Sequence, residues 1–433
     1  MLPRTVSGAA FRASQCLAKR SPHPQMMRLV LHSPSRSLSQ TTMRRRQKYT
    51  ITVGQVRKGT KWEQFKGTFK QHPVYSTLAV SIIVSMLAML GYANYVYITY
   101  IQGSFSAFPE PVAKPLRRAL YYTNITPDPQ RALKYYKEAM AAAEEVRMDP
   151  FSDEVLGLRI QIAYFLEKNH NHALAARVLE GVMEACMAWV AREGDKHVTD
   201  GQRSRVLGKT VGIGVKLGEL YSNPFVDDQE AAEVALVGAV ETVLREKQRR
   251  EKEGVKEGEG DWMSDEEIGG ALESLGEHYQ AAKKPQLATP LFLQALTLCP
   301  PKSCHAAILM NNLAAALSGL PQPSQTQALT PGSPKEPQNI DFTSQATLWA
   351  RKAITLASSI APPERTEECD MACVAATCNL AEFAELQGRP DEALKLWREA
   401  ESLAKAIGYE QGLNMCNEAL TRLAGNANIE HCS

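Results

Sequence analysis

Apolar and small residues recur with helical spacing in the stretch ESLGEHYQAAKKPQLATPLFLQALTLCP, residues 273–300. Separations of three, four and seven positions are typical of helices that bury one face. Small side chains stand where two antiparallel helices would cross closely, and large ones stand where neighbouring pairs would stack. The stretch therefore predicts a helical hairpin, with Ser264 and Glu267 as its capping box and Pro285 at the start of its second helix. The residues assigned to the packing are Leu275, Gly276, Tyr279, Ala288, Phe292, Ala295 and Pro300.

Less regular copies of this hairpin begin near residues 129, 162, 217, 311 and 379, which makes about six units in series. A series of this kind is typical of tetratricopeptide repeats (TPR), in which each hairpin stacks on the next. The expected fold is all-α, with a hairpin solenoid over residues 116–425 and a capping helix near its end, at 410–424. In the copy at 379–400 the packing residues are Leu380, Ala381, Ala384, Ala393, Trp397 and Ala400.

Two segments interrupt the predicted array. The first, QRREKEGVKEGEGDW at 248–262, is charged and contains several glycines, so we expect a solvated helix end or loop. The second, PQPSQTQALTPGSPKEPQNIDF at 321–342, is rich in Pro, Ser and Gln and predicts a loop. Passive insertion is the favoured interpretation of both, and a partner-binding segment is the alternative.

A long apolar run precedes the array. Between Gln71 and Pro109 the chain has no Asp, Glu, Lys or Arg, and tyrosines stand near both ends of the run. About 20 apolar residues cross a bilayer as a helix, and tyrosines favour the interface. The run predicts a single transmembrane helix at 74–101, and a buried core helix is the alternative.

Charge is distributed unevenly along the chain. Residues 1–70 hold fifteen Lys and Arg and one acid, Glu63, whereas the remaining residues hold 34 basic and 46 acidic side chains. An arginine-rich, acid-poor start is typical of a mitochondrial presequence, expected here at 1–42 and followed by a basic matrix-facing stub at 43–73. A disordered basic tail is the alternative. The acidic remainder makes nucleic acid an unexpected partner.

The same asymmetry predicts an orientation. Because the positively charged flank of a transmembrane helix stays on the side of synthesis or of the matrix, we expect the N-terminus in the matrix. The predicted location is therefore the mitochondrial inner membrane, with the array in the intermembrane space.

Motifs for catalysis are not evident in the sequence. The GKT at 208–210 lacks the first glycine of a phosphate-binding loop, because that position is Arg203. The HNH at 170–172 falls in a predicted hairpin turn and has no third metal ligand at useful spacing. We therefore expect a protein that is not an enzyme and that uses no cofactor or metal.

The cysteines allow two interpretations. Free cysteine packs as a small hydrophobic residue, and Cys373 and Cys378 have a spacing compatible with packing on one helix. Packed thiols are the favoured prediction. A disulfide between the region of Cys299 and Cys304 and the region of Cys369 and Cys373 is the alternative.

The first helix of each hairpin is expected to line a concave face that binds peptides. The face lacks the lysines and arginines that would hold a C-terminal carboxylate, so a basic or unfolded segment is the better ligand. A merely solvated acidic face is the alternative. The candidate groove residues are Glu273, Glu277, Gln280, Asn311, Asn312, Glu382 and Glu385.

The order of parts and the segment 116–167 suggest a family. Its most specific stretches, YYTNITPDPQRALKYYKEA and MDPFSDEVLGLRIQIA, resemble the fungal TPR adaptor subunit of the mitochondrial inner-membrane i-AAA protease. The resemblance covers most of residues 70–425. It implies an adaptor that works with the protease and a second adaptor subunit, and that binds unfolded or membrane-protein substrates for degradation. It supplies no catalytic residues.

Two other anchored repeat proteins are alternatives. One is a TPR factor for assembly or maintenance of respiratory complex III, which shares the arrangement of span and array. The other is an outer-membrane TPR import receptor, although such receptors are anchored at their extreme N-terminus and usually have the basic clamp.

Overall fold

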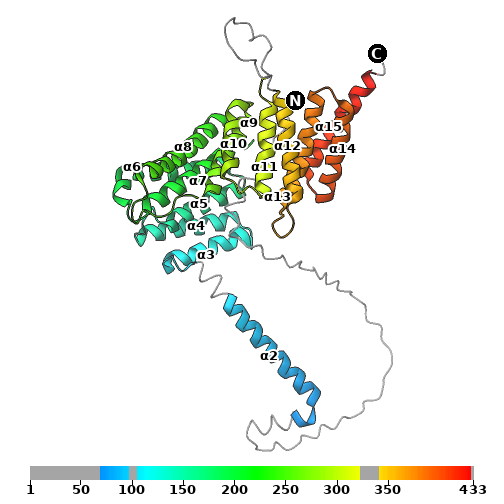
Figure 1. The fold of residues 1–433 in the computed structure, drawn as a ribbon. Coiled ribbons are helices and arrows are strands. Elements are labelled where there is room, and N and C mark those ends of the chain that lie inside the picture. Colours follow the sequence, from blue (N-terminus) through cyan, green and yellow to red (C-terminus); the bar gives the residue numbers. More distant parts are fainter. Residues whose placement is uncertain (1–68, 97–104, 322–340, 431–433) are drawn as a thin grey trace, which may run out of the picture. The chain divides into compact units, whose positions relative to one another are not determined.

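The computed structural model describes residues 69–96, 105–321 and 341–430, and every regular element in these ranges is a helix (Figure 1). The chain divides near Lys114 into an N-terminal part, which contains α2, and the helical array. The predicted presequence at 1–42 and nearly all of the predicted stub at 43–73 lie outside the described residues.

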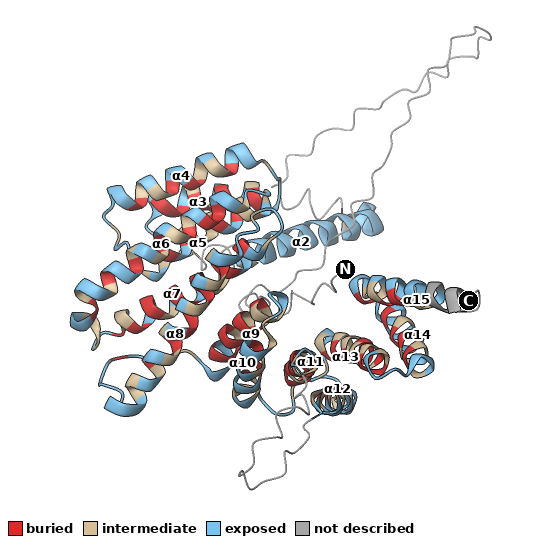
Figure 2. Ribbon diagram, turned by 90° about the horizontal axis from the view of Figure 1, so that it is seen from above, coloured by how far each residue is buried: buried red, intermediate tan, exposed pale blue. Residues whose placement is uncertain are grey.

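Helix α2 spans Pro73–Val96 and has no buried residue. It is the one helix among the described residues that is long and apolar enough to cross a membrane. Figure 2 shows it exposed along its length, which does not fit the alternative of a core helix. Residues 97–101 of the predicted span lie outside the described residues. By length and composition α2 is a candidate membrane span.

The array consists of a run of helices and one short 3-10 helix, η3. Their bounds are α3 Glu110–Asn124, α4 Pro129–Glu145, α5 Asp153–Lys168, α6 His172–Glu193, η3 Gly194–His197, α7 Gln202–Ser222, α8 Gln229–Glu253, α9 Asp265–Ala281, α10 Pro285–Leu298, α11 Cys304–Ser318, α12 Phe342–Ser359, α13 Glu367–Leu386, α14 Pro390–Ile407 and α15 Glu410–Glu430.

These helices pair as hairpins and the hairpins stack. Within the array α5 packs on α6, α7 on α8, α9 on α10, α11 on α12 and α13 on α14. The first helices of successive hairpins also touch, so that α7 contacts α9, α9 contacts α11, and α11 contacts α13. The final helix, α15, packs on α13 and α14 in the position of a cap. The predicted all-α TPR array is confirmed.

Local signals explain where the helices begin. The predicted capping box is present: the Ser264 hydroxyl accepts a hydrogen bond from the Glu267 backbone, and the Glu267 side chain accepts one from the Ser264 backbone. Helices α4, α10 and α14 each have proline in their first turn, where the missing N–H has no helical partner in any case. Each hairpin is thus delimited by its own short-range chemistry.

Packing between the two helices of a hairpin follows the small-and-large pattern. In the α9–α10 hairpin, Phe292 is fully buried against Gly276. A Cβ added to Gly276 would lie 2.8 Å from Cε1 of Phe292, closer than two carbon atoms can approach. The glycine is therefore required for this crossing. Figure 2 shows the buried positions on the sides of helices that face their neighbours.

The segment at 248–262 contains the predicted helix end, residues 248–253 of α8, followed by a loop in which residues 254–258 are exposed. It departs from the prediction at two side chains: Glu259 is 1% exposed, and Trp262 packs against the core. The Glu259 carboxylate forms ion pairs with Arg249 and Arg250 of α8. A buried carboxylate requires such partners, and the two arginines one turn from the end of α8 supply them.

A disulfide joins Cys304, the first residue of α11, to Cys369 in the first turn of α13. The two Cα atoms lie 4.6 Å apart, although 65 residues separate them in sequence. The favoured prediction of packed thiols is wrong for this pair, and the alternative holds. The reason is that α11 and α13 are neighbouring first helices, so their N-terminal ends lie at the same edge of the array.

Candidate protein-binding face

We call the surface formed by α5, α7, α9, α11, α13 and α15 the first-helix face. Polar side chains on it contact one another from helix to helix, and acidic ones outnumber basic ones. Those with such contacts or mutual electrostatic effects include Asp153, Glu167, Arg205, Lys209, Lys216, Glu219, Glu273, Glu277, His305, Asn311, Asn312, Asn379, Glu382, Glu385 and Arg422.

The face begins with a lysine held between two acids. Lys216 Nζ of α7 lies 2.7 Å from Glu167 Oε1 of α5 and 3.1 Å from Glu219 Oε2 in its own helix. The Lys216 side chain is 12% exposed, whereas that of Glu219 is 46% exposed. Glu219 therefore presents its charge to solvent while the lysine is enclosed.

At its centre the face contains a buried carboxylate. The Glu273 side chain has no exposed surface, and its Oε2 lies 3.0 Å from His305 Nε2 of α11. Asn312 donates a 3.4 Å hydrogen bond to Glu273 Oε1. Hydrogen bonding to the Glu273 carboxylate raises the pKa of His305, although burial acts in the opposite direction. Glu273, one of the predicted groove residues, thus lies beneath the face and joins α9 to α11.

Glu277 lies one turn further along α9 and is partly buried. Burial, and then the charges of Glu273 and Glu219, raise the pKa of Glu277 well above its ordinary value. A carboxyl group in these surroundings holds its proton at pH values at which an exposed glutamate has lost it. Glu277 is therefore protonated over a wider range of pH than an exposed glutamate.

The C-terminal part of the face is also polar. Asn379 of α13 donates a 2.8 Å hydrogen bond to the buried Asn311 of α11. Burial, and then the charge of Glu385, raise the pKa of Glu382, which is partly buried. The Trp397 indole donates a 2.7 Å hydrogen bond to Glu385. The two hydrogen bonds fix the side chains of Asn379 and Glu385 on α13.

The structure separates the predicted groove residues into two groups. Glu273 and Asn311 are buried, whereas Gln280, Asn312, Glu277, Glu382 and Glu385 are partly buried. The Oε1 atom of Gln280 is buried and has no hydrogen-bond partner among the described residues. Sequence reasoning missed Lys216, His305, Asn379 and Arg422. Their positions on first helices were the available signal, but their partners lie on neighbouring helices that are distant in sequence.

The predicted packing residues occupy the interior of their hairpins. Tyr279 and Leu380 are partly buried, Pro300 is exposed and is therefore not a packing residue, and the others are buried. The buried ones are Leu275, Gly276, Ala288, Phe292, Ala295, Ala381, Ala384, Ala393, Trp397 and Ala400.

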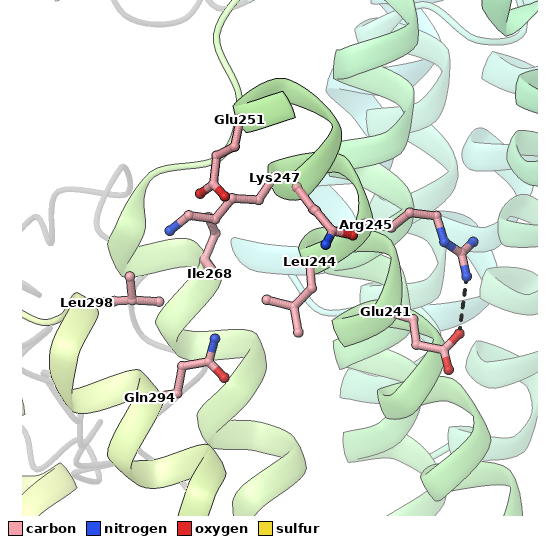
Figure 3. Close-up of a pocket in the computed structure, with 9 residues that line it drawn as sticks. Glu241, Leu244, Arg245, Lys247, Glu251, Ile268, Gln294 and Leu298 are labelled. Atoms are coloured by element: carbon pink, nitrogen blue, oxygen red, sulfur yellow. Dashed lines mark ion pairs between the residues drawn. The ribbon is translucent and has the colours of Figure 1, made fainter. Parts of the chain in front are cut away.

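A separate cavity of about 620 Å³ lies between α8, α9 and α10 (Figure 3). Leu244, Ile268 and Leu298 supply its apolar surface, and an ion pair of 3.6 Å between Glu241 and Arg245 lies at its edge. Its other polar side chains do not form an arrangement of nucleophile and base. Within the described ranges no group of three or more His, Cys, Asp or Glu residues is placed to hold a metal ion.

Comparison with known proteins gives a relative that matches most of the chain. The chain is 30% identical over 370 residues to a TPR repeat-containing protein of Schizosaccharomyces pombe, and the match covers 85% of this chain and 91% of the relative. No protein-family model matches the chain.

Similar solved structures are more distant. A putative kinesin light chain of Podospora anserina with TPR-like repeats is 15% identical, with a TM-score of 0.36, over 58% of this chain and 96% of that chain. BtubC from P. vanneervenii is 12% identical, with a TM-score of 0.35, over 70% of this chain and 93% of that chain.

Proposed function

Because the chain belongs to the TPR repeat-containing proteins, we propose that it is a membrane-anchored, non-catalytic adaptor that binds other proteins through its first-helix face. TPR arrays are scaffolds for protein–protein interaction, and their function lies in the faces that they present. The observation that carries the proposal is the polar, mainly acidic surface that continues from Glu219 on α7 to Glu382 on α13.

The charge of this face supports a particular class of ligand. Acidic side chains on the face outnumber basic ones, and Lys216, His305 and Arg422 are each already paired with a glutamate on the face. Opposite charges steer encounter and disfavour unsuitable partners. The ligand we propose is an extended basic segment of an unfolded or membrane protein.

The finer role that we propose is delivery of such substrates to the i-AAA protease in the intermembrane space, together with a second adaptor subunit. The resemblance of residues 116–167 to the fungal adaptor, the basic N-terminus and the exposed apolar helix α2 support this role. The Cys304–Cys369 disulfide also supports it, because disulfides persist in oxidising compartments.

The disulfide also argues against one of the alternatives, the outer-membrane import receptor. An outer-membrane import receptor presents its array to the reducing cytosol, where a bond such as Cys304–Cys369 is uncommon. A TPR factor for respiratory complex III would have the same membrane anchor and compartment as our proposal. No feature of the described residues favours it, and it is an outcome of the experiment below.

The test is quantitative capture of partners by the full-length chain, tagged and solubilised in mild detergent. We expect enrichment of the i-AAA protease and a second adaptor subunit. Capture of complex III subunits without the protease would support the alternative. The variant Glu219→Lys should lose substrate proteins, whereas Glu241→Lys on α8, where the side chain is 62% exposed, should retain them. Equal loss in both variants would show that the first-helix face is not the binding surface.

Topology provides a separate test. We expect the array to become accessible to added protease only after the outer membrane is ruptured, and the protein to resist carbonate extraction. Digestion of the array in intact mitochondria would contradict the inner-membrane assignment.

A further inference from the structure

Two free cysteines meet in the interior of the C-terminal part of the array. Cys378 of α13 and Cys416 of α15 are 2% and 0% exposed, and their Sγ atoms lie 3.6 Å apart. They belong to an apolar cluster that includes Ala381, Trp397 and Ala419. The two sulfurs thus face each other across the contact between α13 and the capping helix.

We propose that Cys378 and Cys416 form a second disulfide, which fixes the capping helix α15 to α13. Sulfur atoms in a disulfide are about 2.05 Å apart, so the two thiols have to approach by roughly 1.5 Å. A shift of that size is within the reach of side-chain rotation and a small movement of a terminal helix. The pair already has the separation of van der Waals contact, with no other side chain between the sulfurs.

The bond would extend an arrangement that the array already contains. Cys304–Cys369 joins α11 to α13, and Cys378–Cys416 would join α13 to α15. Both bonds connect first helices of neighbouring units. Oxidation would therefore link three consecutive first helices covalently, with α13 in the middle.

The chemistry is thiol–disulfide exchange with a disulfide-bearing oxidant such as glutathione disulfide. The Cys416 thiolate attacks one sulfur of the oxidant, forms a mixed disulfide and releases one thiolate. The Cys378 thiolate then attacks Cys416 Sγ and displaces the second thiolate. The protein loses two thiol protons and two electrons, and the oxidant gains both electrons and becomes two thiols once protonated.

The geometry favours Cys416 as the first nucleophile. A hydrogen bond from Cys378 lowers the pKa of the Cys416 thiol, although burial opposes this effect. Cys416 also lies on α15, the last helix, which packs on α13 and α14. A terminal helix opens locally at lower free energy than the centre of an array, and opening exposes Cys416 to the oxidant.

Formation of the bond would affect the first-helix face. Arg422 lies on α15 less than two turns after Cys416, and it forms an ion pair with Glu385 of α13. A disulfide that holds α15 on α13 would keep Arg422 paired with Glu385. This basic side chain of the first-helix face could then no longer pair with a ligand.

The test uses the purified full-length chain, incubated with glutathione disulfide, then denatured and alkylated. Digestion at Lys, Arg and before Asp gives a peptide at 370–390, because the Arg389–Pro390 bond is not cut, with Cys373 and Cys378, and a peptide at 406–422, with Cys416 alone. We expect these two peptides to be joined. The variant Cys373→Ser removes the ambiguity within the first peptide and should leave the crosslink in place.

A second measurement does not depend on any variant. Hydrogen exchange at the amides of α15 should slow by at least tenfold after oxidation and recover after reduction. The inference is overturned if Cys378 and Cys416 are both alkylated in protein whose Cys304–Cys369 bond is intact. It is also overturned if Cys416 is found bonded to Cys373, or if the exchange rate of α15 is the same in both redox states.

Discussion

Arg422 of the capping helix holds Glu385 of α13 through two contacts: Nη1 lies 2.7 Å from Oε2, and Nη2 lies 3.1 Å from Oε1. Glu385 also accepts a hydrogen bond from Trp397 of α14. One carboxylate therefore connects three helices at the C-terminal end of the array. The Arg422 side chain is 52% exposed, so solvent weakens the ion pair.

Replacement of this arginine should have a modest effect on stability. We expect Arg422→Gln to lower the free energy of unfolding by about 0.5–1 kcal/mol, because the pair is two-pronged but half exposed. Thermal unfolding in detergent measures the change. Arg351→Gln on the exposed surface of α12 is the matched control and should leave the transition unchanged.

The glycine at the crossing of α9 and α10 should tolerate no side chain. Gly276→Ala places a Cβ 2.8 Å from Phe292, and the clash should cost about 1–3 kcal/mol of unfolding free energy. Gly270→Ala in the same helix meets nothing within 4 Å and should be neutral or stabilise by up to about 1 kcal/mol. If both variants unfold at the same denaturant concentration, the close crossing is not as described.

Removal of the disulfide between α11 and α13 should destabilise the array. The double variant Cys304→Ser, Cys369→Ser should lose about 2–4 kcal/mol, because the bond closes a long loop in the unfolded chain. Denaturant unfolding with and without reductant measures the loss. Reductant should shift the midpoint of the wild-type protein and leave that of the double variant much less affected.

The ion pair between His305 and Glu273 predicts a dependence of stability on pH. The folded-state pKa of His305 is raised, so its contribution is fully present below the ordinary histidine pKa of about 6.5 and is lost as pH rises through the raised value. His305→Gln should cost about 1–3 kcal/mol on the acidic side of this window and less on the alkaline side. Unfolding free energies measured across the window test the trend, and a cost that does not vary with pH would contradict it.

Ionisation of Glu277 should lower the free energy of unfolding. Its folded-state pKa is raised, so the protein loses stability as pH rises from the ordinary glutamate value through the raised one. Glu277→Gln removes this penalty and should stabilise the protein at neutral or alkaline pH, by on the order of 1 kcal/mol or more. Glu241→Gln on α8, an exposed acid, should have no comparable effect.

Periodicity allowed the hairpins to be predicted, because their packing depends on residues that are close in sequence. Leu275, Ala288 and Phe292 are buried through contacts within one hairpin or with the next. The capping box at Ser264 could be predicted for the same reason, since both of its partners lie within one turn. The predicted boundary at residue 248 was less accurate, because charged residues continue α8 to Glu253.

The chemistry of the first-helix face depends on contacts between hairpins, which single-helix patterns do not reveal. Glu273 occupies a position that would be exposed on an isolated hairpin, but His305 and Asn312 of the next unit cover it. Cys304 and Cys369 are brought together by the stacking of α11 and α13. Their pairing follows from the array and could not be chosen among several cysteines beforehand.

The bond between Cys304 and Cys369 makes residues 304–369 a covalent ring, and the Pro-rich insertion at 321–342 falls inside that ring. A single cut anywhere in the insertion would open the ring without dividing the molecule. The helices from α12 onward would stay attached to the N-terminal part of the chain. Shedding of the C-terminal helices by a protease that cuts within the insertion thus requires two events, cleavage of a peptide bond and reduction of the disulfide.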